Sequence, residues 1–536
     1  MPIRMTDDPQ EQDQYNDDQG GGGGGRSNFP GGGGGGGLLS LLPLLFSLFR
    51  GKGIIVLLLL AVGAYFFLGK SGGCNMTDVA KLATGGFLDP EQFKKAEIYE
   101  PVSTDDPKNP PLPEAVNLQR FAPAVGNQGQ QGSCVAWSSA YAARSILESA
   151  RTGVQGDQVK FSPAFLYNQI GLDGCQGSYI IRAMEFMTNK GSVPYDQFQY
   201  TDQDCSRQPS GNLQQLAQQY KMRGFNRLTD GDNTEVLDLY AIKQHLAQGA
   251  PVVIGMMVGQ SFMQGMIGQD VWQPESGDRG MMGFGGHAMC VVGYDDKKYG
   301  GSFLLMNSWG PEWGNNGFGW VRYGDFKYYV REAYGVDPMQ KVGAAANVPL
   351  ACEIGLMQVE FDGKKTVPKN NIPLRFSSGN RFETTSPVRI GSKFKIEIKN
   401  STECYIYVFG KETDGTTYTL FPYPTKEDPT KTRYSSFCGI TGYRLFPKDK
   451  SMTPDSIGRR DEIAVVVSKE ELDWNTMNKQ LSQNPQTDLS ARLNAALGSK
   501  AIRNVRFQSS GKGMMQFQVD NDNGQAVGTV VSIDKQ

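Results

Sequence analysis

The chain has 536 residues, enough for two or more globular domains, and its 53 basic and 55 acidic residues almost cancel. This balance argues against nucleic acid as a general partner, because nucleic-acid-binding proteins need a basic surface. Eight cysteines in a chain of this length exclude a small disulfide-rich fold but allow one or two bridges in an oxidising compartment.

The first 37 residues are predicted to form a disordered tail. Residues 1–37 are acidic and rich in Gln, Asn and Gly, and they contain two polyglycine tracts. Such a composition offers too little apolar surface to offset the entropy that is lost on ordering. We therefore expect no stable structure over these residues.

An apolar region follows in two stretches. Leu38–Phe49 is interrupted by a proline and has the length of an interfacial or re-entrant segment. Gly53–Gly69 is close to the minimum length that spans a bilayer as a helix. Arg50 and Lys52 precede the second stretch, which favours an amino terminus inside the cytoplasm. The rest of the chain would then lie outside, on the periplasmic or cell-surface side.

Two other interpretations of this region remain. A cleaved signal peptide has a much shorter polar segment before its apolar core than this chain has. Lipidation at Cys74 needs an apolar residue that the sequence SGGC does not contain. We therefore predict a single-pass membrane segment within residues 38–69, followed by a polar linker over residues 70–111.

The segment NQGQQGSCVAW, residues 127–137, joins a glycine-interrupted loop to the start of a helix. Cys134–Glu148 is rich in helix formers with one apolar stripe, so Cys134 is expected in the first helical turn. Free backbone N–H groups there stabilise a thiolate, the form of cysteine that attacks carbonyl carbon. Gln128, six positions earlier, can donate to a developing oxyanion. A buried structural cysteine is the competing interpretation.

The chain has only two histidines, so an acid-base partner for this thiol is either His245 or His287. His245 lies in a helical pattern and is expected to have a helix-surface or packing role. His287 stands at the start of an apolar run of strand character, which would hold its backbone rigidly. A further strand ends at Asn307, whose amide can hold an imidazole in one tautomer.

Taken together, these elements resemble the papain-like cysteine peptidases. The family pattern has a Gln, a Cys six residues later at a helix start, a His in a G-H-A strand, and N-S-W-G followed by W-G-x-x-G. The chain has each element in order between about Leu112 and Tyr334, namely Gln128, Cys134, His287 with Ala288, Asn307 to Gly310, and Trp313 to Phe318. The resemblance implies an α+β fold with a helical lobe and a β-barrel-like lobe over residues 112–340, with no metal or other cofactor.

The resemblance also assigns roles to the residues of the site. Cys134 would be the nucleophile, His287 the general base and acid, and Asn307 the residue that orients His287. Gln128 would form the oxyanion hole together with the backbone N–H of Cys134. Trp309 would shield the contact between His287 and Asn307 from water. The implied reaction is hydrolysis of a peptide bond in a protein or peptide substrate, through a thioester.

The chain departs from the family pattern beside the nucleophile. Gln131 stands where the family has a cysteine, and Val135 stands where it has a tryptophan. The first change removes the usual disulfide partner of Cys175, and Cys205 also has no usual partner. These two cysteines could pair with each other, which only coordinates can decide.

The substrate-binding residues follow from the same resemblance. Ile180, Gly255 and Ala288 correspond to positions in a substrate pocket, and their apolar character favours a bulky apolar P2 side chain. Ser178 stands where the family has a glycine that bonds the substrate backbone, and Tyr179 follows it. Packing in the core is the competing interpretation for Ile180.

Two segments bear on access to the expected cleft. The linker over residues 70–111 has no room for the family's long helical inhibitory prosegment. Its length would still allow it to cover the cleft, but nothing in it is typical of a prosegment, so the means of inhibition stays open. The Gly- and Met-rich insert from Met256 to Met282 is predicted to close over the cleft, because glycines permit movement and methionines make adaptable apolar contacts. Deletion of Gln260–Gly280 is expected to alter selectivity more than stability.

Residues 341–536 are long enough for a second core and are predicted to be rich in β-strands. Strands are expected around Phe394–Asn400, Tyr405–Gly410 and Glu462–Val467, and a helix over Thr487–Leu497. Through YVFG, LFP and IAVVVS this region resembles an uncharacterised β-rich bacterial domain that is often appended to enzymes. A binding or positioning role is expected, with a partner that the sequence does not identify.

Two classes of function fit these features. One is a membrane-anchored cysteine peptidase, and the other is a catalytically silent papain-like binding or scaffold protein of the cell envelope. Retention of Gln128, Cys134, His287 and Asn307 together favours catalysis. Among enzymes, a thiol amidase acting on peptidoglycan peptides is a narrower alternative.

Overall fold

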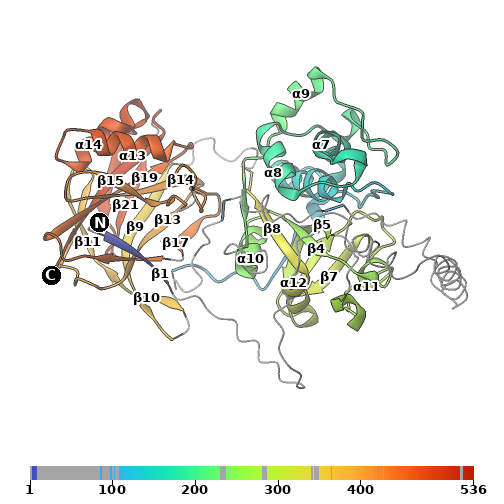
Figure 1. Cartoon of the computed structure of the whole chain (residues 1–536), viewed down its shortest axis with the longest axis horizontal. Coiled ribbons are helices and arrows are strands. Elements are labelled where there is room, and N and C mark those ends of the chain that lie inside the picture. Colours follow the sequence, from blue (N-terminus) through green and yellow to red (C-terminus); the bar gives the residue numbers. More distant parts are fainter. Residues whose placement is uncertain are drawn as a thin grey trace, which may run out of the picture. The chain divides into compact units, whose positions relative to one another are not determined.

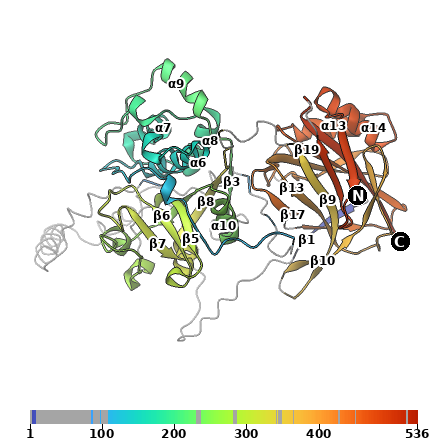
Figure 2. The same cartoon turned by 180° about the vertical axis from the view of Figure 1, so that it is seen from behind.

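The computed structural model describes residues 3–8, 85–86, 97–98, 102, 108–229, 237–280, 286–339, 342, 349–363, 365–425, 428–448, 450–519 and 523–536. The expected membrane segment, Cys74 and most of the expected tail and linker lie outside these ranges. None of the helices within them has both the length and the apolar character needed to cross a membrane. Figures 1 and 2 show the chain from opposite sides.

The central helix of the first domain begins at Cys134, as its periodicity predicts. It runs through α5 (Cys134–Ala136), the π-helical η3 (Trp137–Arg144) and α6 (Ser145–Thr152). Side chains on every face of it are buried from Cys134 to Ser149. The reason is that α7 (Pro163–Ile170) and α8 (Ile180–Asn189) pack on one side of the helix and the sheet packs on the other.

A seven-stranded antiparallel sheet faces these helices (Figure 1). Its strands are β2 (Ala115–Asn117), β3 (Phe225–Arg227), β4 (Val252–Met257), β5 (Gly286–Asp295), β6 (Ser302–Met306), β7 (Phe318–Arg322) and β8 (Val330–Val336). The order is β3-β8-β4-β5-β6-β7, with β2 also beside β5. His287 is the second residue of the central strand β5, and Asn307 follows β6 directly. The expected α+β architecture is confirmed.

Smaller helices complete this domain, namely α9 (Gly211–Ala217), α10 (Leu239–Ala247), α11 (Gln260–Met263) and α12 (Tyr323–Tyr329). His245 lies in α10 and is fully buried, with its Nδ1 atom 3.3 Å from the carbonyl oxygen of Val336. A Cβ atom at Gly335 would lie 2.5 Å from the His245 ring, so this histidine fills a space that only glycine leaves open. Of the two roles expected for His245, on the helix surface or in packing, the structure shows packing.

The insert before His287 differs from its predicted role as a cover. Phe262, in α11, is fully buried, and its ring centroid lies 5.0 Å from that of Trp272 and 5.1 Å from that of Trp313. The backbone carbonyl of Phe262 accepts a 2.8 Å hydrogen bond from the Trp313 indole. Phe262 and Trp272 therefore anchor the described part of the insert in the core of the sheet lobe, whereas Ile267 between them is 57% exposed. Residues 281–285 lie outside the described ranges.

The carboxyl-terminal region contains two further sheets, of eight and seven strands. One of their strands, β1 (Ile3–Asp7), comes from the amino-terminal tail. The others are β9 (Ala351–Phe361), β10 (Thr366–Ile372), β11 (Leu374–Ser378), β12 (Arg381–Thr384), β13 (Phe394–Asn400), β14 (Cys404–Lys411), β15 (Thr417–Phe421), β16 (Phe437–Cys438), β17 (Gly442–Phe446), β18 (Lys450–Pro454), β19 (Arg460–Ser468), β20 (Val505–Ser509), β21 (Met515–Val519) and β22 (Ala526–Asp534). One path runs β1-β18-β13-β9-β21-β20 and the other β11-β12-β22-β19-β14-β15. The expected β-rich region and its predicted strands are confirmed.

Strand β14 shows why this region has three layers. Ile406 and Val408 point into a core shared by the two sheets, whereas Tyr407 and Phe409, one residue along in each case, point into a second core beneath α13 (Trp474–Gln483) and α14 (Leu489–Leu497). Both faces of the strand are thus buried, which explains its continuous apolar sequence. Figure 1 shows the two helices over this sheet, and α14 confirms the helix expected there.

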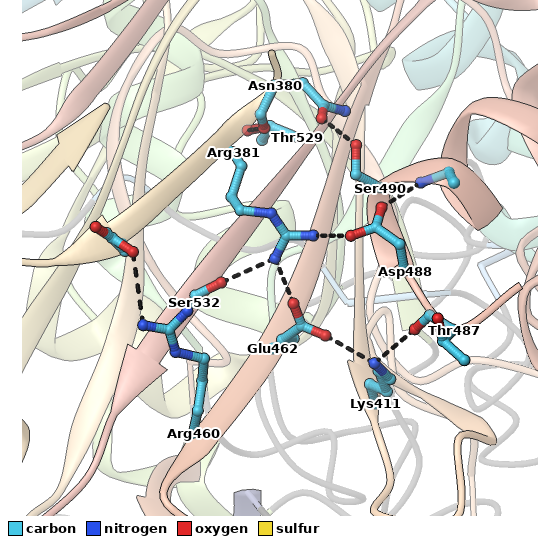
Figure 3. Close-up of polar contacts among 12 residues, drawn as sticks. Asn380, Arg381, Lys411, Arg460, Glu462, Thr487, Asp488, Ser490, Thr529 and Ser532 are labelled. Atoms are coloured by element: carbon cyan, nitrogen blue, oxygen red, sulfur yellow. Dashed lines mark hydrogen bonds and ion pairs between the residues drawn. The ribbon is translucent and has the colours of Figure 1, made fainter. Parts of the chain in front are cut away.

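A polar network joins the start of α14 to strands of the same sheet (Figure 3). Arg381 of β12 forms ion pairs with Glu462 of β19 and with Asp488, the residue that caps α14. It also donates a 3.1 Å hydrogen bond to the hydroxyl of Ser532. Glu462 in turn accepts a 2.8 Å bond from Lys411. One guanidinium therefore connects three strands to a helix start.

The amino-terminal tail differs from the expectation of disorder over one short stretch. Residues 3–7 form the strand β1 (Ile3–Asp7), which pairs antiparallel with β18 and places Met5 opposite Met452. Ile3 is only 1% exposed and belongs to the core between the two sheets. Alternation of apolar and polar residues over Ile3–Asp7 gives the strand one buried face, a local pattern that the composition of the whole tail conceals. The rest of the tail lies outside the described ranges.

Candidate active site

Cys134 lies at the start of the central helix, beneath the first residues of β5. Its side chain is fully buried, and its Sγ atom accepts a 3.4 Å hydrogen bond from the backbone N–H of Ala288. Ala288 directly follows His287, so the helix and the strand bring the thiol beside the histidine-bearing backbone. The two sequence segments that carry the expected nucleophile and base therefore meet.

The imidazole of His287 is held in place by the amide of Asn307 and the indole of Trp309. Its Nε2 atom lies 2.7 Å from Oδ1 of Asn307, and its Nδ1 atom has no hydrogen-bond partner among the described residues. The ring of Trp309 stacks on the imidazole, with centroids 4.2 Å apart and planes 19° apart. Asn307 is itself fixed, because its backbone N–H donates to the carbonyl of Gly317 at 3.1 Å. The arrangement leaves Nδ1 as the ring atom that can exchange a proton.

Gln128 is fully buried and bonded on both sides of its amide. Its Nε2 atom donates to the Gln131 carbonyl at 3.0 Å, and its Oε1 atom accepts from the Ser308 hydroxyl at 2.7 Å. An amide nitrogen carries two hydrogens, so a second one can be donated to an oxyanion. These bonds fix the orientation of the amide before any ligand is present.

Burial keeps both reactive groups neutral in this arrangement. It raises the pKa of the Cys134 thiol to about 12, although backbone hydrogen bonds, foremost that of Ala288, lower it in part. Burial likewise lowers the pKa of His287 to about 4, against a smaller opposing effect of the Asn307 hydrogen bond. The thiolate expected at the helix start is therefore not the stable form here, because loss of solvent outweighs the helix amides.

The loop beside the nucleophile is braced differently from the family pattern. Cys175 and Cys205 form a disulfide with Cα atoms 6.0 Å apart, which was one of the pairings left open by the sequence. The carbonyl of Cys175 accepts a 3.4 Å hydrogen bond from the N–H of Gly132. Gln131 is 4% exposed, and its amide has no hydrogen-bond partner among the described residues. The disulfide thus supports the loop in place of the missing cysteine.

Gly255, Ala288 and Ile180 lie on packed elements of the domain, whereas Ser178 and Tyr179 belong to the loop before α8. Gly255 and Ala288 lie side by side as Cα partners on β4 and β5. Ile180 begins α8, which packs against β4, and it is 1% exposed. Ser178 is buried and donates its hydroxyl to the Ile170 carbonyl, whereas Tyr179 is partly exposed and contacts the Arg182 guanidinium. Across the described ranges, no cluster of three His, Cys, Asp or Glu side chains is placed as a metal site requires.

A segment that the sequence did not single out lies against this site. Gly85 and Gly86 are buried, and their N–H groups lie 3.4 and 3.0 Å from the carbonyl oxygen of Gly286. The Gly85 carbonyl accepts a 2.9 Å hydrogen bond from the N–H of Ser178. In the sequence, only the pair of glycines within a polar linker marks this segment. Such pairs are common in loops and do not indicate a contact with an active site.

Comparisons with known proteins agree with this geometry over part of the chain. Residues 112–336 match the family described as "Papain family cysteine protease", and residues 387–436 match "Domain of unknown function (DUF4384)". Cathepsin K of Gallus gallus is 32% identical over 216 residues, which cover 38% of this chain and 58% of that protein. Cathepsin L2 of Homo sapiens is 26% identical over 244 residues, covering 42% of this chain and 64% of that protein. The chain thus spans about three fifths of the length of these relatives.

Solved structures also match part of the chain. Xylellain, a cysteine protease from Xylella fastidiosa, is 22% identical, with 49% of this chain and 97% of that chain covered and a TM-score of 0.39. The cysteine protease CMS1MS2 of Carica candamarcensis is 21% identical, with coverage of 43% and 100% and a TM-score of 0.33. The family match stands on the sequence: residues 112–336 of this chain match the papain family of cysteine proteases, which are hydrolases, and residues 387–436 match a domain of unknown function.

Proposed function

We propose that the protein is a cysteine peptidase that hydrolyses peptide bonds at Cys134. The observation that carries this proposal is the pairing of His287 Nε2 with Asn307 Oδ1 at 2.7 Å, which leaves Nδ1 unbonded among the described residues. The backbone of the next residue, Ala288, bonds the Cys134 thiol at 3.4 Å. A nucleophile, a base and an orienting group thus occupy one buried site.

The first half of the reaction forms a thioester. Transfer of the thiol proton to Nδ1 of His287 gives a thiolate and an imidazolium, and the thiolate attacks the substrate carbonyl carbon. The resulting oxyanion accepts hydrogen bonds from Gln128 Nε2 and from the N–H of Cys134. The imidazolium then gives its proton to the leaving amine, and the carbon–nitrogen bond breaks.

The second half releases the acid. His287, neutral again, takes a proton from a water molecule that attacks the thioester carbonyl. Collapse of the second tetrahedral species expels the Cys134 thiolate, which recovers its proton from the imidazolium. Asn307 keeps the imidazole in place through both halves, and Trp309 covers their hydrogen bond.

The test compares two buried thiols of the same domain. Wild type, Cys134→Ala and Cys290→Ala are assayed on casein and on fluorogenic peptides in mild reductant. Cys290 lies on β5, three residues after His287, and is fully buried, so it is a matched control without a catalytic role. We expect Cys290→Ala to retain wild-type hydrolysis and Cys134→Ala to lose it. Equal rates with and without Cys134 would contradict the proposal.

A preference for apolar P2 side chains is the second part of this proposal. Gly255 and Ala288 are adjacent on neighbouring strands, and Ile180 begins a helix that packs on one of them. A pocket without charge disfavours a charged side chain, because nothing compensates the lost hydration. Peptides that vary only at P2 should rank Leu and Phe above Lys and Glu in kcat/KM. Gly255→Leu should shift the ranking toward small residues, and an unchanged ranking would contradict this assignment.

Membrane attachment through the apolar residues 38–69 is the third part of the proposal. The pairing of β1 with β18 favours a topology in which residues 3–7 and residues 450–454 lie on one side of the membrane. We propose that residues 38–69 attach the protein to the membrane; a single crossing there, as predicted from the sequence, would place residues 3–7 and residues 450–454 on opposite sides. Met5→Cys with Met452→Cys should form an intramolecular disulfide in isolated membranes, since these residues are paired. A membrane-bound protein that forms no such bond would instead support a single crossing.

A further inference from the structure

A lysine and two aspartates are enclosed beside the core of the carboxyl-terminal region. Lys535 directly follows β22, Asp461 is the second residue of β19, and Asp455 directly follows β18. Their side chains are 0%, 1% and 5% exposed, respectively. These three residues are here called the Lys535 cluster.

The strand pattern directs the cluster inward. Asp461 shares a face of β19 with Ile463. Lys535 continues the face of β22 that carries Ile533. Both isoleucines are fully buried in the core that the two sheets share. β19 and β22 are antiparallel neighbours, and Lys535 extends their pairing, since its N–H donates to the carbonyl of Arg459 at 2.9 Å. The amine and the carboxyl group therefore project from adjacent strands toward the same apolar core.

The Nζ atom of Lys535 has three oxygen neighbours. It lies 2.7 Å from Oδ1 of Asp461, and it donates to Oδ1 of Asp455 at 3.1 Å and to the carbonyl of Ile457 at 2.7 Å. Asp455 is held in turn, because its Oδ1 atom accepts from the N–H of Ile457 at 2.8 Å. The Oδ2 atoms of both aspartates have no hydrogen-bond partner among the described residues. The amine is thus fixed against two carboxyl groups, each with an unbonded oxygen.

One ammonium group cannot neutralise two carboxylates. If all three groups were ionised, one negative charge would stay uncompensated away from water, which is strongly unfavourable. Burial accordingly raises the pKa of Asp461 to about 6, against the opposing effect of Lys535. The uncharged acid is therefore accessible at Asp461 near neutral pH, and a proton shared between Lys535 and Asp455 would leave no charge in the cluster.

We propose that Lys535 and Asp461 join through an isopeptide bond that the chain forms by itself, with Asp455 as the group that moves the protons. Nζ and the carboxyl carbon are already neighbours, since Oδ1 at 2.7 Å is bonded to that carbon. The proposal does not depend on the peptidase function, because the cluster belongs to the carboxyl-terminal region and uses no group of the Cys134 site.

The reaction begins with Lys535 as ammonium, Asp455 as carboxylate and Asp461 as the uncharged acid. Asp455 takes a proton from the ammonium, and the free amine attacks the carboxyl carbon of Asp461, which forms the carbon–nitrogen bond. The nitrogen then gives a second proton, relayed by Asp455, to the hydroxyl group on that carbon. The carbon–oxygen bond breaks and water leaves. The products are an amide, one water molecule and protonated Asp455, so no oxidant or other reactant is needed.

Two effects favour this reaction over amide formation in water. The fold holds the reacting groups in contact, and well-oriented intramolecular reactions reach effective molarities on the order of 10⁵ M or more. The reaction also replaces an ammonium and a carboxylate by neutral groups in a place where charge is costly. The bond would tie the last strand of the chain to β19, so unfolding could not begin by release of that strand.

Peptide mapping of the full chain tests the inference. After denaturation and digestion with trypsin, the bond should join residues 461–469 to residues 513–536 in one branched peptide, whose mass is lower than the sum of its parts by one water molecule. Trypsin should not cut after Lys535, because the amide removes the charge that the protease recognises. Neither part contains cysteine, and processing of the amino terminus does not alter them.

Four variants accompany the wild type. Lys535→Met removes the amine, and Asp455→Asn keeps an acceptor oxygen but cannot carry a proton. Lys411→Met is the matched control, since Lys411 forms a 2.8 Å ion pair with Glu462 on the same strand as Asp461 but is 22% exposed. Cys134→Ala removes the proposed catalytic thiol. Far-ultraviolet circular dichroism shows that each variant is folded.

We expect the branched peptide in wild type, Lys411→Met and Cys134→Ala, and not in Lys535→Met. Asp455→Asn should lower the joined fraction in freshly purified protein about tenfold or more, because a positioned acid-base group is lost. Separate peptides in wild type, with cleavage after Lys535, would show an ion cluster only and overturn the inference. A wild-type joined fraction in Asp455→Asn would overturn the role given to Asp455. The wild-type digest decides without any variant, so a variant that does not fold leaves the bond testable.

Discussion

The Nε2 atom of His287 lies 2.7 Å from the Oδ1 atom of Asn307, and the next backbone N–H, that of Ser308, donates to the same Oδ1 atom at 2.8 Å. The Asn307 amide oxygen is therefore fixed by its own chain before it bonds the imidazole. Replacement of Asn307 should change the orientation of His287 without changing how substrate binds.

Asn307→Ala should lower kcat by roughly 10- to 100-fold, the scale of one lost hydrogen bond to a group that becomes charged. KM should change little. The Asn307 hydrogen bond raises the pKa of His287, so its loss should also move the acidic limb of the pH profile to lower pH. Steady-state kinetics from pH 4 to 9 measure both effects. A raised KM at unchanged kcat would contradict the positioning role.

Glu332 on β8 should make stability depend on pH. Its side chain is buried beside the Tyr334 hydroxyl, 2.9 Å away, and burial raises the pKa of this carboxyl from 4.5 to about 8. The folded protein therefore keeps a proton that the unfolded chain releases above about pH 4.5. This contribution to stability is complete below that pH and is lost as pH rises to about 8.

Thermal unfolding at pH 5, 7 and 9 checks this expectation. Tm should fall with rising pH in wild type and fall less steeply in Glu332→Gln, which cannot ionise. The slope should not vanish, because burial also raises the pKa of Asp337 to about 7. The exposed Glu275→Gln variant should retain the wild-type slope. Parallel curves for wild type and Glu332→Gln would refute the assignment.

The Cys175–Cys205 disulfide should stabilise the domain by closing a loop. The two residues are separated by 30 positions, for which chain-entropy arguments give about 3 to 4 kcal/mol. The double variant Cys175→Ser with Cys205→Ser should lose a stability of this order in denaturant unfolding. Dithiothreitol should lower the stability of wild type but not that of the variant. Wild-type stability that is insensitive to reductant would show that the bond contributes little.

Substitution of Phe262 distinguishes a core role from a lid role for the insert before His287. Its ring is fully buried among Trp272, Trp309 and Trp313, so Phe262→Ala should cost about 3 to 5 kcal/mol of unfolding free energy. Gln260→Ala, at an exposed position of the same short helix, should cost little. Unchanged stability of Phe262→Ala together with an altered substrate profile would restore the lid interpretation.

Local sequence patterns predicted the parts of the site that depend on neighbouring residues. The periodicity after Cys134 predicted a helix start, and the apolar runs around His287 and Asn307 predicted two strands. These strands proved to be hydrogen-bonded neighbours, and the motif order places both side chains at one end of the pair. The β-branched and aromatic runs at Tyr405 and Glu462 predicted strands for the same reason.

Such local patterns do not predict contacts between segments that are far apart in the sequence. The position of Gly85 depends on Gly132, Ser178 and Gly286, and nothing in the linker itself encodes that meeting. The neutral state of Cys134 likewise depends on how completely distant segments exclude water from it. The helix start, which is local, suggested a thiolate, and tertiary burial reversed that expectation.

The strand β1 has a consequence for how the protein behaves in solution. It covers the free edge of β18, whose backbone N–H and C=O groups would otherwise be exposed. Bare strand edges recruit further strands from other molecules and lead to aggregation. Preparations that lack residues 3–7, or that carry a bulky fusion directly before them, should therefore self-associate, even though these residues are far in sequence from the domain they protect.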